Sequence, residues 1–163
     1  MAVIEPDVNA IKEEIVSILK TNSELWETDS HENGFTDILV GLPTQAKFTG
    51  LTYPICFVTN DTNLENDKIL GNPIGSELRD SHHIMQFRIM FFDQGATGAD
   101  VEVSLDNYYK LIKQTLKENF RLNSVQGVIS AFPIRGHSFN FGEMEGQAID
   151  GRVIILQVQV AST

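Results

Sequence analysis

The chain has 163 residues, of which 42% are hydrophobic and 21% charged, as in an ordinary globular domain. Its formal net charge is -10, with 14 acidic and 5 basic residues up to Asp80, and 8 acidic and 7 basic residues after it. This balance argues against binding to nucleic-acid phosphates, which needs clustered Lys and Arg.

The cysteine content and the hydropathy pattern exclude further classes of protein and of site. Cys56 is the only cysteine, which excludes an internal disulfide and a multi-cysteine zinc site. It lies in the apolar run 53–58 with no cation nearby in the sequence, so a buried structural thiol is favoured over a nucleophile. No apolar run approaches the roughly 20 residues that cross a bilayer, and the N-terminus lacks a signal-peptide pattern. We therefore expect a soluble protein made in the cytoplasm, without a membrane partner.

The N-terminal half predicts a helix, two strands and a loop. Apolar residues recur at helical spacing over residues 7–20, and Pro6 with Asp7 suits the start of a helix. A short strand is expected within residues 35–40. A second strand is expected over residues 53–59, where Pro54 indicates either a sheet edge or the strand start. The polar stretch 60–80 predicts a long loop, and a loop of this length is a candidate partner-contacting arm.

The second half predicts the central strand and the main helix. Residues 82–92 alternate, with an apolar face that includes Met85 and Phe87 and a mixed face that includes Gln86 and Arg88. Asp100 suits the N-cap of a helix whose apolar stripe continues to Phe120. Strands are then expected over residues 128–134, 137–141 and 152–160, with a hairpin-like turn over 142–151.

This order of elements predicts the fold class. Strands and helices are clustered instead of alternating in regular β-α units, which favours an antiparallel arrangement. We predict one α+β domain over residues 1–163, with two principal helices packed on a mainly antiparallel sheet.

The sequence contains no convincing catalytic or metal-binding motif. Asp61, Glu65 and Asp67 resemble a calcium loop, but Asn66 occupies the position that needs glycine, so a solvated acidic loop is favoured. His82 and His83 are adjacent, and adjacent strand residues point to opposite faces. No GxSxG nucleophile motif and no glycine-rich phosphate loop occur. We therefore expect no enzyme activity, no cofactor and no metal.

The whole-chain order carries a resemblance to a known family. Its parts are the helix that starts at Val8, the strand Tyr53-Pro54-Ile55-Cys56-Phe57-Val58, the strand 83–92, the helix 105–120 and the terminal strand 151–158. This order resembles that of the tail terminator (tail-completion) proteins of long-tailed bacteriophages and related viruses. The resemblance implies a non-catalytic subunit of a ring, typically a hexamer, on the head-proximal end of the tail tube. Such a ring stops tube polymerisation and joins the tube to head-completion or neck proteins.

The resemblance implies partners and a place in the virion. The subunits contact each other and the tail tube protein, and DNA passes through the ring without specific binding, which suits an acidic chain. Candidate interface residues lie in the polar arm, on the mixed face of the central strand and in the C-terminal turn: Asp61, Glu65, Asp67, Arg79, Arg88, Glu143 and Glu145.

Two other classes of function stay open at the level of the sequence. A neck or head-closure protein of the same virion would share ring symmetry and look similar. A cytosolic oligomeric enzyme subunit or small-ligand-binding domain would build its site across an interface, from Arg88, Arg135, His137 and Glu145.

Overall fold

The computed structural model describes residues 7–28, 34–42, 51–69, 81–125, 127–144 and 147–162. The elements follow in the order α1 (Val8–Leu19), β1 (Asp37–Val40), β2 (Ile55–Ile69), β3 (Ser81–Gly95), α2 (Gly98–Glu118), a 3-10 turn (Leu122–Ser124), β4 (Val128–Met144) and β5 (Gln147–Ser162). The five strands form one sheet in the order β1-β2-β3-β5-β4. Only the β1–β2 pair is parallel in this sheet, so the predicted α+β class is confirmed.

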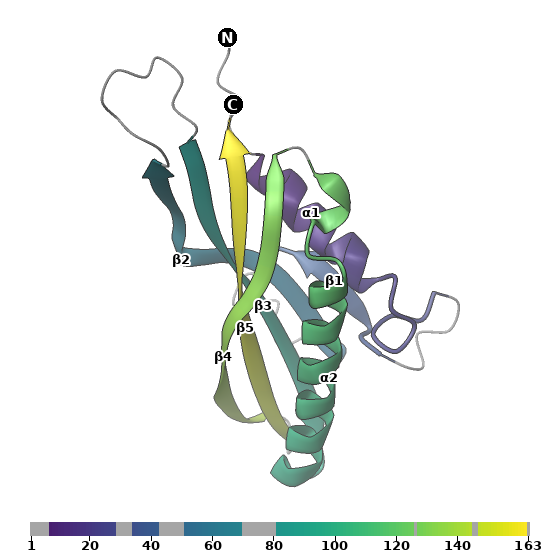
Figure 1. Ribbon diagram of the computed structural model, residues 1–163. Coiled ribbons are helices and arrows are strands. Elements are labelled where there is room, and N and C mark those ends of the chain that lie inside the picture. The colour runs from purple at the N-terminus through teal and green to yellow at the C-terminus, as the bar shows by residue number, and fades with distance from the viewer. Residues whose placement is uncertain are drawn as a thin grey trace, which may run out of the picture.

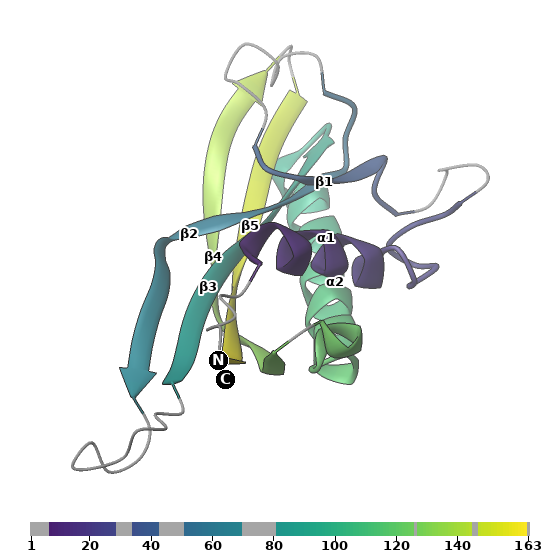
Figure 2. The ribbon, with the colours of Figure 1, turned by 90° about the horizontal axis from the view of Figure 1, so that it is seen from above.

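Both helices lie on the same side of the sheet (Figures 1 and 2). Each helix buries one apolar face, because its apolar residues recur every three or four positions. The predicted apolar face of β3 is confirmed: its side chains pack under the helices with alternate residues of β5. These core residues of the two strands are Met85, Phe87, Ile89, Phe91, Ile154, Leu156, Val158 and Val160.

The two helices begin at side-chain caps. Asp7, at the predicted helix start, is the N-cap of α1, where its carboxylate accepts a hydrogen bond from the backbone N–H of Ala10 at 3.0 Å. The predicted N-cap of α2 is wrong. Thr97 is the cap, and its hydroxyl accepts from the backbone N–H of Asp100 at 3.3 Å. The carboxylate of Asp100 accepts a hydrogen bond from Thr97 in return, so both residues fix the helix start.

The loop predicted over residues 60–80 is wrong for its first ten residues. β2 continues to Ile69, and its outer part pairs with β3 from Glu65 opposite Met85 to Ile69 opposite Ser81. Backbone pairing with β3 does not need apolar side chains, so the polar sequence hides this strand. Residues 70–80 lie outside the described part. β2 lies between β1 and β3, so Pro54 marks a strand start and not a sheet edge.

The C-terminal part has two long strands where three shorter ones were expected. β4 is continuous, but its pairing with β5 is irregular between Val128 and Ser130, between Pro133 and Arg135, and between Asn140 and Gly142. Bulges at an edge strand tolerate proline and glycine, which is why the strand does not end at Pro133. The hairpin predicted over residues 142–151 is confirmed, but its turn is shorter than expected, because β4 and β5 pair antiparallel up to Met144 opposite Gln147.

Candidate functional site: the second sheet face and the sheet edges

The sheet face opposite the helices carries a small apolar cluster. Ile55, Phe57 and Phe92 are buried there, with Leu51, Tyr53 and Met90 packed against them. The rings of Phe57 and Phe92 meet edge to face, with their centroids 6.1 Å apart. Burial raises the pKa of Tyr53 above its ordinary value.

Next to this cluster lies a group of charges centred on Asp61. Oδ1 of Asp61 lies 3.0 Å from Nε of Arg88, and its Oδ2 lies 3.9 Å from Nη2 of Arg135. In the strand register Arg88 and Arg135 flank Ile155 from β3 and β4. Ile155 is buried, as expected if the long arginine stems lie over it.

This group is not fully hydrogen-bonded. Nε of Arg88 lies close to Asp61 Oδ1, but its N–H is not aligned with that oxygen for a hydrogen bond. Arg88 Nε, Asp61 Oδ2 and Gln86 Oε1 are thus buried without a hydrogen-bond partner in the part of the chain that the structure describes. Buried polar atoms that lack a partner are costly and rare, so this face can accept a further polar group. The arrangement supplies two guanidinium groups against one carboxylate, which can hold an anionic group but offers no nucleophile of its own.

The predicted interface residues fall into two groups. Asp61 and Arg88 are brought together, but the solvated loop expected around Asp61 is wrong, because this residue is only 8% exposed and lies in a strand. The other five have side chains outside the described part. Among these, Glu65 lies opposite Met85 in the register, Asp67 opposite His83 and Glu143 opposite Ala148, while Arg79 and Glu145 are not described at all.

The residues considered for an enzyme site are only partly assembled. Arg88 and Arg135 both approach Asp61, whereas His137 lies further along β4, opposite Val153, and is exposed. No three His, Cys, Asp or Glu side chains of the described residues lie close enough to hold a metal ion. None of the described helices is both long and apolar enough to cross a membrane.

Both edge strands of the sheet expose apolar side chains, which the sequence analysis missed. At the β1 edge, Leu39, Val40 and Leu42 are 39%, 38% and 46% exposed. At the β4 edge, the exposed fractions of Ile129, Phe132 and Ile134 are 39%, 49% and 43%. The sequence shows these residues as ordinary strand formers, because the strand order that makes β1 and β4 the edges is set by tertiary pairing.

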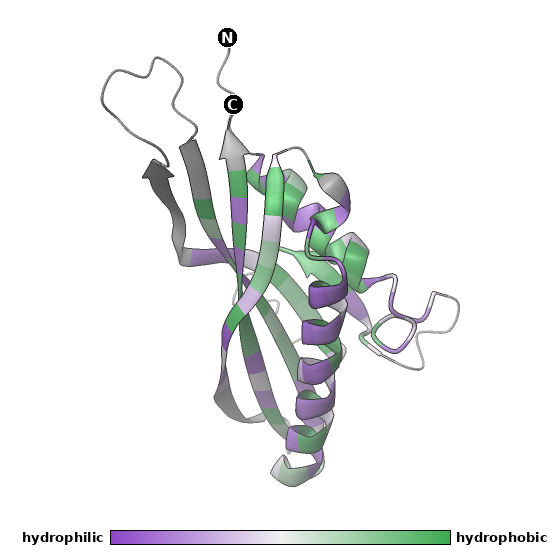
Figure 3. Cartoon of the chain, viewed as in Figure 1, coloured by the Kyte–Doolittle hydropathy of each residue, from purple (hydrophilic) through white to green (hydrophobic). Residues whose placement is uncertain are grey.

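A stripe of lysines follows the outer side of α2, beside the β4 edge. Tyr109, Lys110, Lys113, Gln114, Lys117 and Glu118 line a groove of about 560 Å³. The exposed side of α2 is strongly hydrophilic in Figure 3. Gly136 of β4 lies directly under Tyr109, because a Cβ built there would be 2.2 Å from the Tyr109 hydroxyl oxygen. Helix α2 therefore packs very closely on β4 at this point.

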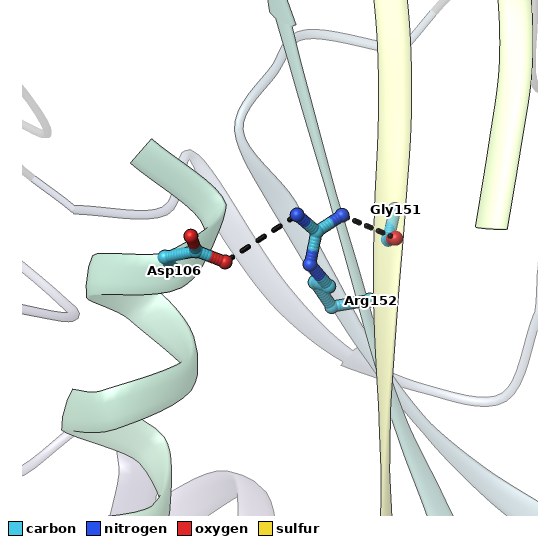
Figure 4. Close-up of polar contacts among 3 residues, drawn as sticks. All are labelled: Asp106, Gly151 and Arg152. Carbon is cyan, nitrogen blue, oxygen red and sulfur yellow. Dashed lines mark hydrogen bonds and ion pairs between the residues drawn. The ribbon is translucent and has the colours of Figure 1, made fainter. Parts of the chain in front are cut away.

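An ion pair also joins α2 to β5 (Figure 4). Nη2 of Arg152 lies 3.4 Å from Oδ1 of Asp106, and its Nη1 donates a hydrogen bond to the carbonyl oxygen of Gly151 at 3.2 Å. Arg152 is mostly buried while Asp106 is exposed, so this contact orients the arginine more than it stabilises the fold.

Comparisons with known proteins identify no family. No family model matches the chain, and no curated protein matches it. Among solved structures, the fold is similar to a chain described as "Virion of native gene transfer agent (GTA) particle", with 10% identity and a TM-score of 0.42 over 77% of this chain and 79% of that one. Values this low do not transfer a function.

Proposed function

We propose that this chain is a structural subunit of a virus-like particle, and specifically a tail terminator. It caps the head-proximal end of the tail tube, ends tube polymerisation and forms the joint to the head, without catalysing a reaction. The proposal is supported by the order of helices and strands, which fits the order that the family resemblance implies.

The observation that carries the proposal is the pair of exposed apolar sheet edges. Exposed strand edges promote pairing with other chains, and soluble monomers usually protect them with charges or cover. Here the two ends of one sheet, β1 and β4, both carry apolar side chains. Two different edges on opposite sides suit head-to-tail contacts, which close into a ring when the rotation between subunits allows it. A hexamer is the ring that the family resemblance implies.

The charge of the chain fits this role. A net charge of -10 suits a ring through which DNA passes without adhering to the wall. The partners under this proposal are further copies of the chain, the tail tube protein and a head-completion or neck protein.

The test is a tube-capping assay. The purified chain is examined by size-exclusion chromatography with light scattering, and then added to tail tube protein from the same genome during polymerisation. We expect a ring, in solution or at tube ends in negative-stain micrographs, and shorter tubes as its concentration rises. Serum albumin at the same concentration is the control and should leave tube length unchanged.

Two results would contradict the proposal. The chain could be a stable monomer that neither binds tube ends nor changes tube length, and that binds a metabolite in a thermal-shift screen. This result would favour the ligand-binding or enzyme alternative. A ring that binds the portal assembly of the head and not the tube would instead favour the neck protein.

A further inference from the structure

We infer that neighbouring copies of this chain join through two unlike flanks of the subunit. The basic flank consists of the β4 edge (Ile129, Phe132 and Ile134) and the lysine stripe of α2. The acidic flank consists of the β1 edge (Leu39, Val40 and Leu42) and the layer formed by α1 and the turn after it. The inference rests on the proposed ring and names the contact that builds it.

The apolar residues on each flank supply the first step. Three large apolar side chains are more than one-third exposed at each edge. Five of them lie on β1 or β4, the edge strands whose outer backbone groups face away from the sheet, and Leu42 follows β1 by two residues. Joining the two edges would bury both sets together and extend the sheet by main-chain pairing.

The charges on the two flanks supply the second step, because they are opposite. The described residues between Asp7 and Leu42 include six acidic and only two basic side chains. These are Asp7, Glu13, Glu14, Glu24, Glu27 and Asp37, and Lys12 and Lys20. The segment 109–121 includes four basic side chains and one acidic side chain. These are Lys110, Lys113, Lys117 and Arg121, and Glu118. A basic stripe on a strongly acidic chain therefore finds its complement on the other flank of the same chain.

The two helices differ in the strands that they contact. α1 packs on β1 and β2, and also against α2 and the 3-10 turn, whereas α2 packs on β5, β3 and β4. Both helices lie on the same side of the sheet (Figure 2), so joining the β4 edge to a β1 edge brings α2 of one subunit beside the α1 layer of the next. Apolar contact and charge attraction then act in the same place and in the same orientation.

A second copy fits the basic flank better than nucleic acid does. Nucleic acid would use the lysines but leave the exposed edge side chains of β4 in water, and the charge of -10 would oppose its approach. The acidic flank offers both an apolar strip and carboxylates.

The experiment uses charge reversal in two variants, at positions that are exposed. The first variant is Lys110→Glu with Lys117→Glu, and the second is Glu13→Lys with Glu24→Lys. The first variant makes the basic flank net negative, with three acidic against two basic side chains, and the second makes the acidic flank neutral, with four of each. Each variant should therefore lose the oligomer seen for the unmodified chain, with subunit affinity at least about 10-fold weaker in about 0.1 M salt. An equimolar mixture should restore association, because the unchanged acidic flank of the first variant attracts the unchanged basic flank of the second.

Matched controls separate loss of the contact from loss of the fold. Leu42→Asp and Phe132→Asp should each weaken association, whereas Val103→Asp should not, although Val103 is 72% exposed. Circular dichroism and thermal unfolding of every variant should match the unmodified chain. Light scattering measures the oligomeric state in solution. For rings that form only on tube ends, the tube-capping assay shows whether the variant still assembles.

Each outcome decides one of the two proposals. If both charge variants stay oligomeric, or if their mixture fails to restore association, the inferred contact is wrong, while tube capping by the unmodified chain would still support the terminator function. If the mixture restores association and the unmodified chain does not cap tubes, the contact stands and the terminator function fails. The unmodified chain could also retain nucleic acid and lose it in the variant Lys110→Glu with Lys117→Glu. That result would show that the lysines bind nucleic acid, and it would overturn the inferred contact between subunits.

Discussion

Nε of Arg88 lies 3.0 Å from Oδ1 of Asp61, and this ion pair joins β2 to β3 on the sheet face away from the helices. It lies where the pairing of the two strands becomes irregular, between Asn60 and Glu65. The Asp61 side chain is only 5% exposed, so the pair acts in a place with little water to screen it. It therefore holds the two strands together where the regular ladder is interrupted.

Asp61→Asn should lower the free energy of unfolding by about 1–3 kcal/mol, because it leaves Arg88 without its counter-charge. Double-mutant cycles with Arg88→Gln and Arg135→Gln, measured by urea unfolding at one protein concentration, should give unequal couplings. We expect about 1 kcal/mol for Arg88 and less than about 0.5 kcal/mol for the more distant and more exposed Arg135. Equal couplings would show that Asp61 is not held mainly by Arg88.

Gly34 and Gly41 form a matched pair for testing backbone contact. Their φ angles are +83° and +82°, so alanine is strained to a similar degree at either position. A Cβ at Gly34 would also lie 2.4 Å from the carbonyl oxygen of Leu25, whereas nothing lies within 4 Å of one at Gly41. Gly41→Ala should cost about 1 kcal/mol and Gly34→Ala at least about 2 kcal/mol more, by thermal or urea unfolding. Similar losses would refute the close contact with Leu25.

Gly136→Ala tests how closely α2 packs on β4. The new methyl group would overlap the ring of Tyr109, so we expect destabilisation of about 1–3 kcal/mol. In a Tyr109→Ala background the same substitution should cost little, because the ring that it meets is gone. A loss that is unchanged in that background would place the strain in the backbone of β4 and not in the contact with Tyr109.

Tyr108 should make stability depend on pH in the alkaline range. Burial, and secondly the carboxylate of Asp93, raise the pKa of Tyr108 above its ordinary value of 10.0, while a hydrogen bond with Ser104 opposes this. Because the folded-state pKa is the higher one, unfolding releases a proton above pH 10, and the stability present below that pH is lost as pH rises further. The unmodified chain should therefore lose unfolding free energy more steeply than Tyr108→Phe above that pH, and parallel curves would contradict this.

The thiol of Cys56 should be inert in the folded chain. Complete burial raises its pKa far above the ordinary range, so both access and the thiolate are lost. Labelling with a thiol reagent near neutral pH should be slow and should accelerate in proportion to the unfolded fraction as urea is added. Rapid labelling without urea would show that β2 opens locally at this position.

Sequence periodicity predicts those parts of this fold in which one apolar face decides the structure. The first helix, the central strand and the last strand follow from the spacing of side chains such as Ile11, Ile15, Phe87 and Leu156, which are all buried. Hydrophobic burial fixes which face of these elements points inward, so their pattern is visible in the sequence.

The outer part of β2 and the two sheet edges could not be predicted in this way. Asn60 and residues 65–69 pair through the backbone with β3, and backbone pairing leaves no apolar period in the sequence. The pairing of Arg88 with Asp61 depends on strand register, which a one-residue shift would destroy. Exposure of Phe132 and Leu42 depends on the order of strands, which is decided by contacts far apart in the chain.

The position of β5 in the sheet has a consequence for the order of events in the cell. β5 is synthesised after the other four strands, yet it lies between β3 and β4 and pairs with both along nearly their whole length. Until β5 has left the ribosome, β4 has no strand of the sheet to pair with, so the β1 edge and the β4 edge are not yet part of one sheet. If copies of the chain join through these two edges, as proposed above, each subunit must fold completely before it can bind a neighbour.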